Sequence, residues 1–92
     1  MVRDSKRTRV DIILDMLKCI SEKNGQIKPT HLMYKSNLSY VQMKEYLNEM
    51  KSKGLISESL EKEKKMIIIT KKGKDFLSSI VQMREFQKTF GL

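Results

Sequence analysis

The residues of this chain that offer the most chemistry gather at the start of one predicted helix. Ser39, Tyr40, Gln42 and Lys44 lie within a few positions of one another, and Asn48 follows on the face expected to be exposed. Side chains near the N-terminus of a helix in a major groove reach base edges. Gln can pair with adenine, Lys with guanine or a phosphate, and the Tyr hydroxyl with a phosphate. These residue types predict noncovalent recognition of bases and phosphates.

Some of these side chains also have a structural interpretation. Ser39 and Gln42 form the S-x-x-Q pattern of a capping box, in which each side chain accepts a hydrogen bond from the other residue's backbone N–H. Tyr40 can either contact a phosphate or pack sideways on the core. Glu45 lies on the exposed face and repels phosphate, unless it accepts a hydrogen bond from a cytosine. The start of the helix is therefore expected to approach a nucleic acid more closely than its middle.

The helix that carries these residues is predicted to span about 39–53. Ser39 caps its start, and Gly54 provides the left-handed backbone conformation that ends a helix. Apolar residues spaced three and four apart define its buried face. These are Met43, Tyr46, Leu47 and Met50.

A β-hairpin is predicted directly after this helix. Strand-like runs at 55–60 and 65–70 flank the charged segment 61–64. Such a hairpin is the wing of a winged helix-turn-helix, here at about 60–65. Three lysines of this wing are expected to lie on a nucleic-acid backbone, because each neutralised phosphate releases counterions. They are Lys62, Lys64 and Lys65.

The elements before the helix complete a helix-turn-helix. Apolar periodicity predicts a first helix from Thr8 to about Lys23, and Gln26-Ile27-Lys28 can add a short strand. Pro29 suits the first turn of a short second helix that ends near Lys35. Residues 36–38 then turn the chain into the Ser39 cap. The predicted fold class is mainly α with an α+β wing, ending in a long helix from Thr70 to about Phe90.

The charge of the chain favours a polyanionic partner. Its 92 residues include 19 Lys and Arg against 11 Asp and Glu, which gives a net charge of +8 and a pI near 9.7. Such a balance governs association rather than fold. The segment 1–8 is expected to be a basic arm that is either a solvated terminus or a phosphate contact. The further candidate contacts are Arg3, Lys6, Arg7, Arg9 and Lys35.

Enzymatic chemistry finds little support in the sequence. His31 is the only histidine and Cys19 the only cysteine, so metal sets built from His and Cys are excluded. The four glycines are too scattered for a phosphate loop. No cofactor, metal or small-molecule ligand is expected. Without an apolar run of membrane-spanning length or a signal-peptide pattern, the chain is expected to be cytoplasmic and nucleoid-associated, with no membrane partner.

The last helix predicts a homodimer. Its apolar residues beyond the small domain follow a heptad-like pattern, and a monomer would expose them. The candidate dimerisation residues are Phe76, Ile80, Met83, Phe86 and Phe90. Alternatively the helix folds back onto the stripe formed by Ile12, Met16 and Cys19, and both arrangements can hold along different parts of its length. This gives three expected regions: arm 1–8, winged-helix domain 9–75 and dimerisation segment 76–92.

Several of these motifs occur together in a known family. Asn37-Leu38-Ser39-Tyr40, Tyr46-Leu47, Gly54-Leu55-Ile56 and Thr70-Lys71-Lys72-Gly73 stand in this order along the chain. From Thr8 to Val81 the sequence resembles the small archaeal winged-helix DNA-binding proteins of the 10a type. The resemblance implies a last helix that forms an antiparallel coiled coil in a homodimer. It also implies binding of double-stranded DNA with limited sequence preference.

We therefore expect a double-stranded DNA-binding protein that acts as a small transcriptional regulator or chromatin-associated protein. A winged helix used for protein–protein interaction is one alternative, although protein interfaces are usually depleted in lysine. RNA binding is another, although the hairpin strands are mainly aliphatic and offer no aromatic platform for single-stranded bases.

Overall fold

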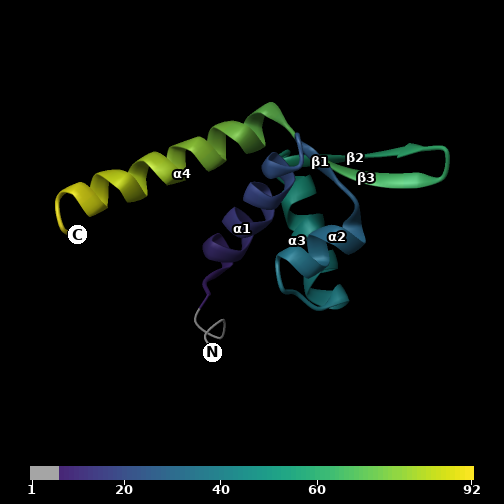
Figure 1. Ribbon diagram of the computed structural model, residues 1–92, viewed down its shortest axis with the longest axis horizontal. Helices are drawn as coiled ribbons and strands as arrows, with labels where there is room; N and C mark the ends of the chain where they lie inside the picture. Colours follow the sequence, from purple (N-terminus) through teal and green to yellow (C-terminus); the bar gives the residue numbers. More distant parts are fainter. Residues whose placement is uncertain (1–6) are drawn as a thin grey trace.

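The elements follow one another in the order that the sequence predicts. The computed structural model describes residues 7–92 and is shown in Figure 1. Its elements are α1 (Arg9–Glu22), β1 (Gln26–Ile27), α2 (Pro29–Lys35), α3 (Tyr40–Ser52), β2 (Ile56–Glu61), β3 (Lys64–Ile69) and α4 (Lys71–Thr89). The strands form one antiparallel sheet in the order β1-β3-β2. This is a winged helix-turn-helix with a long C-terminal helix.

α1 begins at a capping box. The Thr8 hydroxyl accepts a hydrogen bond from the Asp11 N–H at 3.0 Å, and the Asp11 carboxylate accepts one from the Thr8 N–H at 3.0 Å. Each side chain thus satisfies a backbone donor that the helix leaves unpaired. The helix places Met16, Leu17 and Ile20 in the core. Its periodicity also assigns Val10 to the core face, but Val10 is exposed because it lies in the first turn, outside the cluster of buried side chains.

The connection between α2 and α3 is tight. Asn37 has a left-handed backbone (φ 56°), and the Leu38 N–H donates to the Met33 carbonyl at 3.1 Å. This hydrogen-bonding pattern ends α2, because it pairs carbonyls that the last turn leaves free. Leu38 is buried and anchors the turn in the core, as its apolar side chain predicts.

α3 has the boundaries that its two terminal signals predict. The Ser39 hydroxyl accepts from the Gln42 N–H at 3.1 Å, and Gln42 Oε1 accepts from the Ser39 N–H at 3.0 Å. At the other end Gly54 is left-handed (φ 76°), and the Leu55 N–H donates to the Met50 carbonyl at 2.9 Å. The capping box and the glycine terminator are therefore confirmed.

The hairpin turn is shorter than the sequence predicts. β2 and β3 pair from Ile56 opposite Ile69 to Glu61 opposite Lys64, so two residues form the turn instead of the expected four. Lys62 and Glu63 are both left-handed, with φ of 50° and 64°. Two left-handed residues match the twist of a two-residue hairpin, although Asn-Gly is the usual sequence for it. Because residues 61–64 are all charged, the sequence does not indicate that Glu61 and Lys64 belong to the strands.

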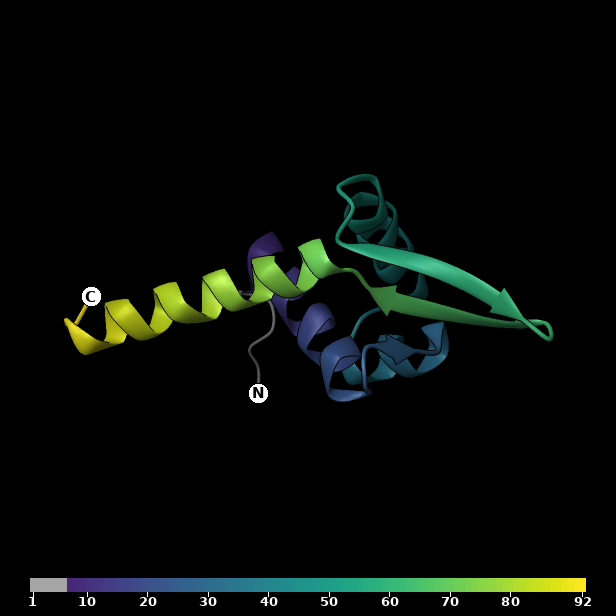
Figure 2. The same cartoon turned by 90° about the horizontal axis from the view of Figure 1, so that it is seen from above.

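α4 leaves the domain in the direction opposite to the hairpin. Figures 1 and 2 both show this helix and the β2–β3 hairpin extending from opposite sides of the body formed by α1, α2 and α3. The Thr70 hydroxyl caps the helix by accepting from the Gly73 N–H at 3.0 Å. Phe76 and Leu77 pack against the core, whereas the helix beyond Ile80 is exposed. The near part of the helix is thus covered by its own domain.

Candidate nucleic-acid interface

A groove runs between α3 and the hairpin. It has a volume of about 150 Å³ and is lined by Pro29, Tyr40, Met43, Lys44, Leu47, Asn48, Lys51, Glu58 and Lys65. Three side chains of α3 in this lining, Tyr40, Lys44 and Asn48, are spaced four residues apart and so share one flank of the helix. With Lys65 of β3, they are predicted contact residues that the structure brings together.

The exposed ring of Tyr40 belongs to this groove. Tyr40 is 61% exposed, and the Lys44 ammonium lies 6.0 Å from the centre of its ring. This distance is at the limit for an attraction between a cation and an aromatic face. Of the two uses open to Tyr40 in the sequence, packing on the core is therefore excluded, and the ring lies at the surface beside Lys44.

Glu58 lies in the groove between two lysines from different elements. Its carboxylate accepts from Lys51 of α3 at 3.0 Å and from Lys65 of β3 at 3.5 Å. Burial by itself raises the pKa of Glu58, but the two ammonium groups outweigh it, so the pKa of this carboxyl lies below its ordinary value. Neither Lys51 nor Glu58 was among the predicted contacts. Their pairing depends on how the hairpin packs against α3, which no local sequence pattern encodes.

The opposite flank of α3 is acidic. Gln42, Glu45 and Glu49 line a separate depression there, together with Arg9 and Tyr46. Glu49 pairs with Lys53 at 3.2 Å and with Arg9. The hydrogen bond from Lys53 is the largest influence on Glu49, and with Arg9 it lowers the pKa of that carboxyl. The charge of Glu49 on this flank is thus balanced by Arg9 and Lys53, and Glu45 adds a further carboxylate.

Gln42 is less suited to base recognition than its residue type predicts. Pairing with adenine requires the side-chain carbonyl as well as the amide N–H. The carbonyl oxygen of Gln42 already accepts the Ser39 N–H of the capping box. In the observed conformation Gln42 closes the cap of α3, and a bidentate contact with adenine would have to use the second lone pair of the same oxygen.

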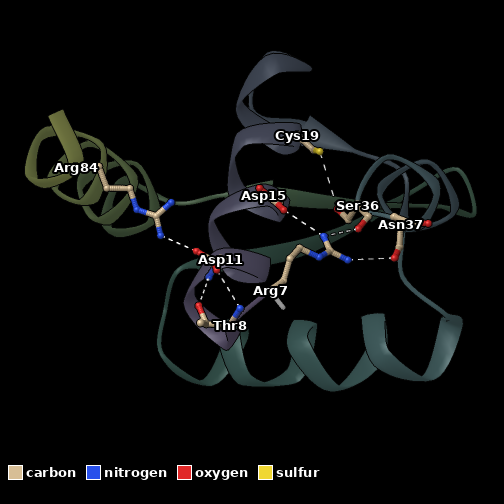
Figure 3. Close-up of polar contacts among 8 residues, drawn as sticks. All are labelled: Arg7, Thr8, Asp11, Asp15, Cys19, Ser36, Asn37 and Arg84. Atoms are coloured by element: carbon tan, nitrogen blue, oxygen red, sulfur yellow. Dashed lines mark hydrogen bonds and ion pairs between the residues drawn. The ribbon is translucent and has the colours of Figure 1, made fainter. Parts of the chain in front are cut away.

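Arg7 points into the domain rather than outward. Figure 3 shows its guanidinium between α1 and the turn that precedes α3. One guanidinium nitrogen lies 3.1 Å from the Asp15 carboxylate and 3.0 Å from the Ser36 carbonyl, and the other donates to the Asn37 carbonyl at 3.2 Å. In this conformation Arg7 links the N-terminal segment to the helix-turn-helix turn, and its role as a phosphate contact stays a prediction.

The remaining predicted contacts lie apart from the groove. Lys62 and Lys64 are exposed at the end of the hairpin, and Lys35 is exposed in the last turn of α2. Arg9 is engaged by Glu49 on the acidic flank. Arg3 and Lys6 lie outside the described residues. Lys64 and Lys65 are consecutive in β3 and so lie on opposite faces of the hairpin, and the predicted lysine contacts do not form one continuous patch.

The predicted dimerisation residues divide into two groups. Phe76 packs against the core of its own domain and Ile80 is half-buried; a role of these two residues in dimerisation stays a prediction. Met83, Phe86 and Phe90 are 53%, 62% and 64% exposed, and the two phenylalanine rings lie 4.8 Å apart. The exposed group forms an apolar surface on the far part of α4.

The described residues offer little for other chemistry. Within residues 7–92, no group of three His, Cys, Asp or Glu side chains could hold a metal ion. Burial raises the pKa of the Cys19 thiol, which disfavours the reactive thiolate. Over the same range, no helix combines the length and the apolarity needed to cross a bilayer.

Comparison with known families identifies the architecture. The model of a family described as winged helix-turn-helix matches residues 6–88. The chain belongs to this winged helix-turn-helix family. The match includes the helix-turn-helix, the hairpin and nearly all of α4. A search among curated protein sequences finds no match to this winged-helix chain.

Solved structures with the same fold come from several sources. Sso10a-2, a DNA-binding protein from Sulfolobus solfataricus, is similar with a TM-score of 0.72 and 23% identity, over 92% of this chain and 90% of that one. F93 from STIV, a winged-helix DNA-binding protein, has a TM-score of 0.74 and 14% identity, over 91% and 95%.

A longer neighbour is a putative transcriptional regulator from Pseudomonas aeruginosa PA01. It has a TM-score of 0.77 and 18% identity, over 92% of this chain and 59% of that one. The winged-helix chain therefore spans only part of that regulator. At these identities the three likenesses establish the fold.

Proposed function

We propose that this protein binds double-stranded DNA through the groove between α3 and the hairpin. The observation that carries this proposal is the convergence of Tyr40, Lys44 and Asn48 from α3 with Lys65 from β3 along one groove. Helix and hairpin can then engage DNA together, with the start of α3 in the major groove and the hairpin on the sugar-phosphate backbone. Glu45 on the opposite flank of α3, which repels phosphate, supports this orientation.

Each groove residue has a role that its chemistry supports. The exposed amide of Asn48 can pair with adenine, and Lys44 can reach guanine or a phosphate. The hydroxyl of Tyr40 can donate to a phosphate. Lys62, Lys64 and Lys65 provide backbone contacts from the hairpin, and Arg3 and Lys6 can add others from the N-terminal segment. Ser39 and Gln42 contribute by fixing the start of α3.

We further propose a homodimer through the exposed apolar surface of α4. Met83, Phe86 and Phe90 supply apolar area that a second copy of the same surface can cover. A two-fold dimer would present two copies of α3, the proposed recognition helix, to half-sites about 34 Å apart on one face of B-DNA. This assembly is the one implied by the resemblance to the 10a type. The similar fold of Sso10a-2 supports the resemblance.

The biological role that fits these features is a small transcriptional regulator or a chromatin-associated protein. Solved structures with this fold include proteins described as DNA-binding and as transcriptional regulators, which supports DNA as the partner. A protein bound to chromosomal DNA would be nucleoid-associated and cytoplasmic.

A salt-titrated binding assay with duplex DNA, duplex RNA and single strands tests the proposal. Duplex DNA should bind most tightly, with a logarithmic affinity that falls linearly with the logarithm of salt concentration. Lys44→Ala should weaken binding, whereas Lys18→Ala removes the same charge from α1, outside the groove, and should have a smaller effect. Equal or tighter binding of RNA or single strands would contradict the proposal.

A further inference from the structure

Two lysines in the groove meet at a single carboxylate. Lys51 contributes its ammonium from the last turn of α3 and Lys65 contributes its own from β3, and they bind different oxygens of Glu58, at 3.0 and 3.5 Å. Two ammonium groups that bind the same carboxylate can also bind a phosphate. The site therefore has the charge and the spacing for an anion from outside the chain.

The relative exposure of the three side chains shows how an outside anion would reach the lysines. The Glu58 side chain is 22% exposed, whereas those of Lys51 and Lys65 are 44% and 47% exposed. The Glu58 side chain as a whole is thus less exposed than either lysine side chain. Each ammonium carries three N–H donors, so donors beyond those used on Glu58 remain to meet a ligand at the mouth of the groove.

The position of the pair places it beside the proposed DNA contacts. Lys51, Lys44 and Asn48 line the same groove, and Lys65 is paired with Leu60 across the hairpin. A DNA backbone that follows the groove would carry its phosphates past both lysines. The negative charge of Glu58 would then lie within a few ångströms of a phosphate, where repulsion is only weakly screened.

We propose that Lys51 and Lys65 form a binding site for a backbone phosphate of DNA, and that Glu58 occupies this site as a competing anion in the free protein. The inference rests on the proposed function and adds that Glu58 limits the affinity for DNA. Without DNA, Glu58 holds the hairpin against α3 and neutralises part of the groove. On binding, a phosphate takes over donors from Glu58, so the carboxylate lowers the affinity for DNA.

Charge-matched variants measure this competition. Glu58→Gln keeps the shape and removes the negative charge, and Glu22→Gln removes the same charge from an exposed position of α1 outside the groove. On a fixed duplex, Glu58→Gln should raise the affinity several-fold more than Glu22→Gln. Its salt slope should steepen by about one unit for each lysine released to a phosphate. An affinity equal to or below that of Glu22→Gln overturns the proposal.

A second pair of variants tests the lysines with Glu58 in place. Lys51→Ala removes one half of the proposed phosphate site, and Lys53→Ala removes the same charge from a side chain that pairs with Glu49 on the acidic flank. Lys51→Ala should lower the affinity and flatten the salt slope by about one unit, clearly more than Lys53→Ala. This comparison stands even if Glu58→Gln loosens the hairpin, which a thermal melt of each variant would reveal.

The outcomes separate the two proposals. If the unaltered protein fails to bind duplex DNA at low salt, the proposed function itself is wrong. If it binds but each variant behaves like its matched control, DNA binding stands and the competing role of Glu58 is refuted. Several-fold tighter binding by Glu58→Gln together with weaker binding by Lys51→Ala supports the phosphate site.

Discussion

Arg84 of α4 donates a hydrogen bond of 2.7 Å to Asp11 of α1, across 73 positions of the chain. Figure 3 shows the two side chains meeting between the first turn of α1 and the far part of α4. Asp11 also closes the capping box with Thr8. One carboxylate thus joins the start of α1 to the helix that we propose forms the dimer. In the homodimer that we propose, this contact would help to fix the direction of α4 and with it the spacing of the two α3 helices.

The first prediction concerns acid stability. The backbone N–H of Thr8, followed by Arg84, lowers the pKa of Asp11 from 3.8 to about 2. Because this pKa is lowered by folding, the stabilisation is complete above about pH 4 and is lost as the pH falls through the folded value. As the pH is lowered from about 4 to about 2, the melting temperature should fall more for the unaltered protein than for Asp11→Asn. Arg84→Ala should retain much of the effect, since Thr8 is the larger influence.

The second prediction concerns Gly73 at the start of α4. A Cβ at this position would lie 2.2 Å from the Leu55 carbonyl oxygen and 2.9 Å from Cγ1 of Ile69. Gly73→Ala should therefore destabilise the domain by about 1 to 3 kcal/mol or more, despite a helix preference of about 1 kcal/mol for Ala. Urea unfolding is the measurement. Ser79→Ala, at an exposed position of the same helix, should change stability little, and equal stability of the two variants would contradict the close approach.

The third prediction separates the two faces of α3 with neighbouring residues. Leu47 is 4% exposed and Asn48 is exposed beside it. Leu47→Ala should cost about 2 to 5 kcal/mol of unfolding free energy as a core truncation. Asn48→Ala should leave the melt nearly unchanged and weaken DNA binding. A stable Leu47→Ala would show that the packing of α3 is wrong, and unchanged binding by Asn48→Ala would remove Asn48 from the interface.

The fourth prediction concerns the lysines of the hairpin. Replacing Lys62, Lys64 and Lys65 together with Ala should weaken binding about uniformly across DNA sequences. The salt slope should flatten by roughly one unit for each phosphate that the variant no longer neutralises. The matched control replaces Lys71, Lys72 and Lys74, which carry the same total charge at the start of α4. If the two triple variants bind alike, the hairpin does not bind the DNA backbone.

The fifth prediction concerns assembly. Phe86→Ala combined with Phe90→Ala removes the neighbouring pair of exposed, mutually tilted rings on α4. Sedimentation at micromolar concentration should show a dimer for the unaltered protein and a shift to monomer for the double variant. DNA binding should weaken through the loss of bivalency while the domain stays folded. Glu85→Gln changes an exposed residue on the other face of α4 and serves as the control for assembly. A monomeric unaltered protein would refute the dimer.

Local chemistry made much of the fold predictable. The capping box of Ser39 with Gln42, the cap at Thr70 and the terminator Gly54 involve residues within a few positions of one another, so their types and spacing specify the ends of α3 and the start of α4. The hairpin followed from two strand-like runs. The turn is two residues shorter than the sequence predicts. Lys62 and Glu63 adopt left-handed backbones that their residue types rarely favour, so their types do not indicate a two-residue turn.

The sequence by itself determined the order of the elements, the phase of α3 and the basic character of the chain, because these depend on short-range periodicity and composition. Only the tertiary structure placed Arg7 against the turn before α3, joined Arg84 to Asp11 and brought Glu58 between Lys51 and Lys65. Such contacts join residues from different elements. Their geometry follows from how helices and hairpin pack around the shared core, which no spacing along the chain records.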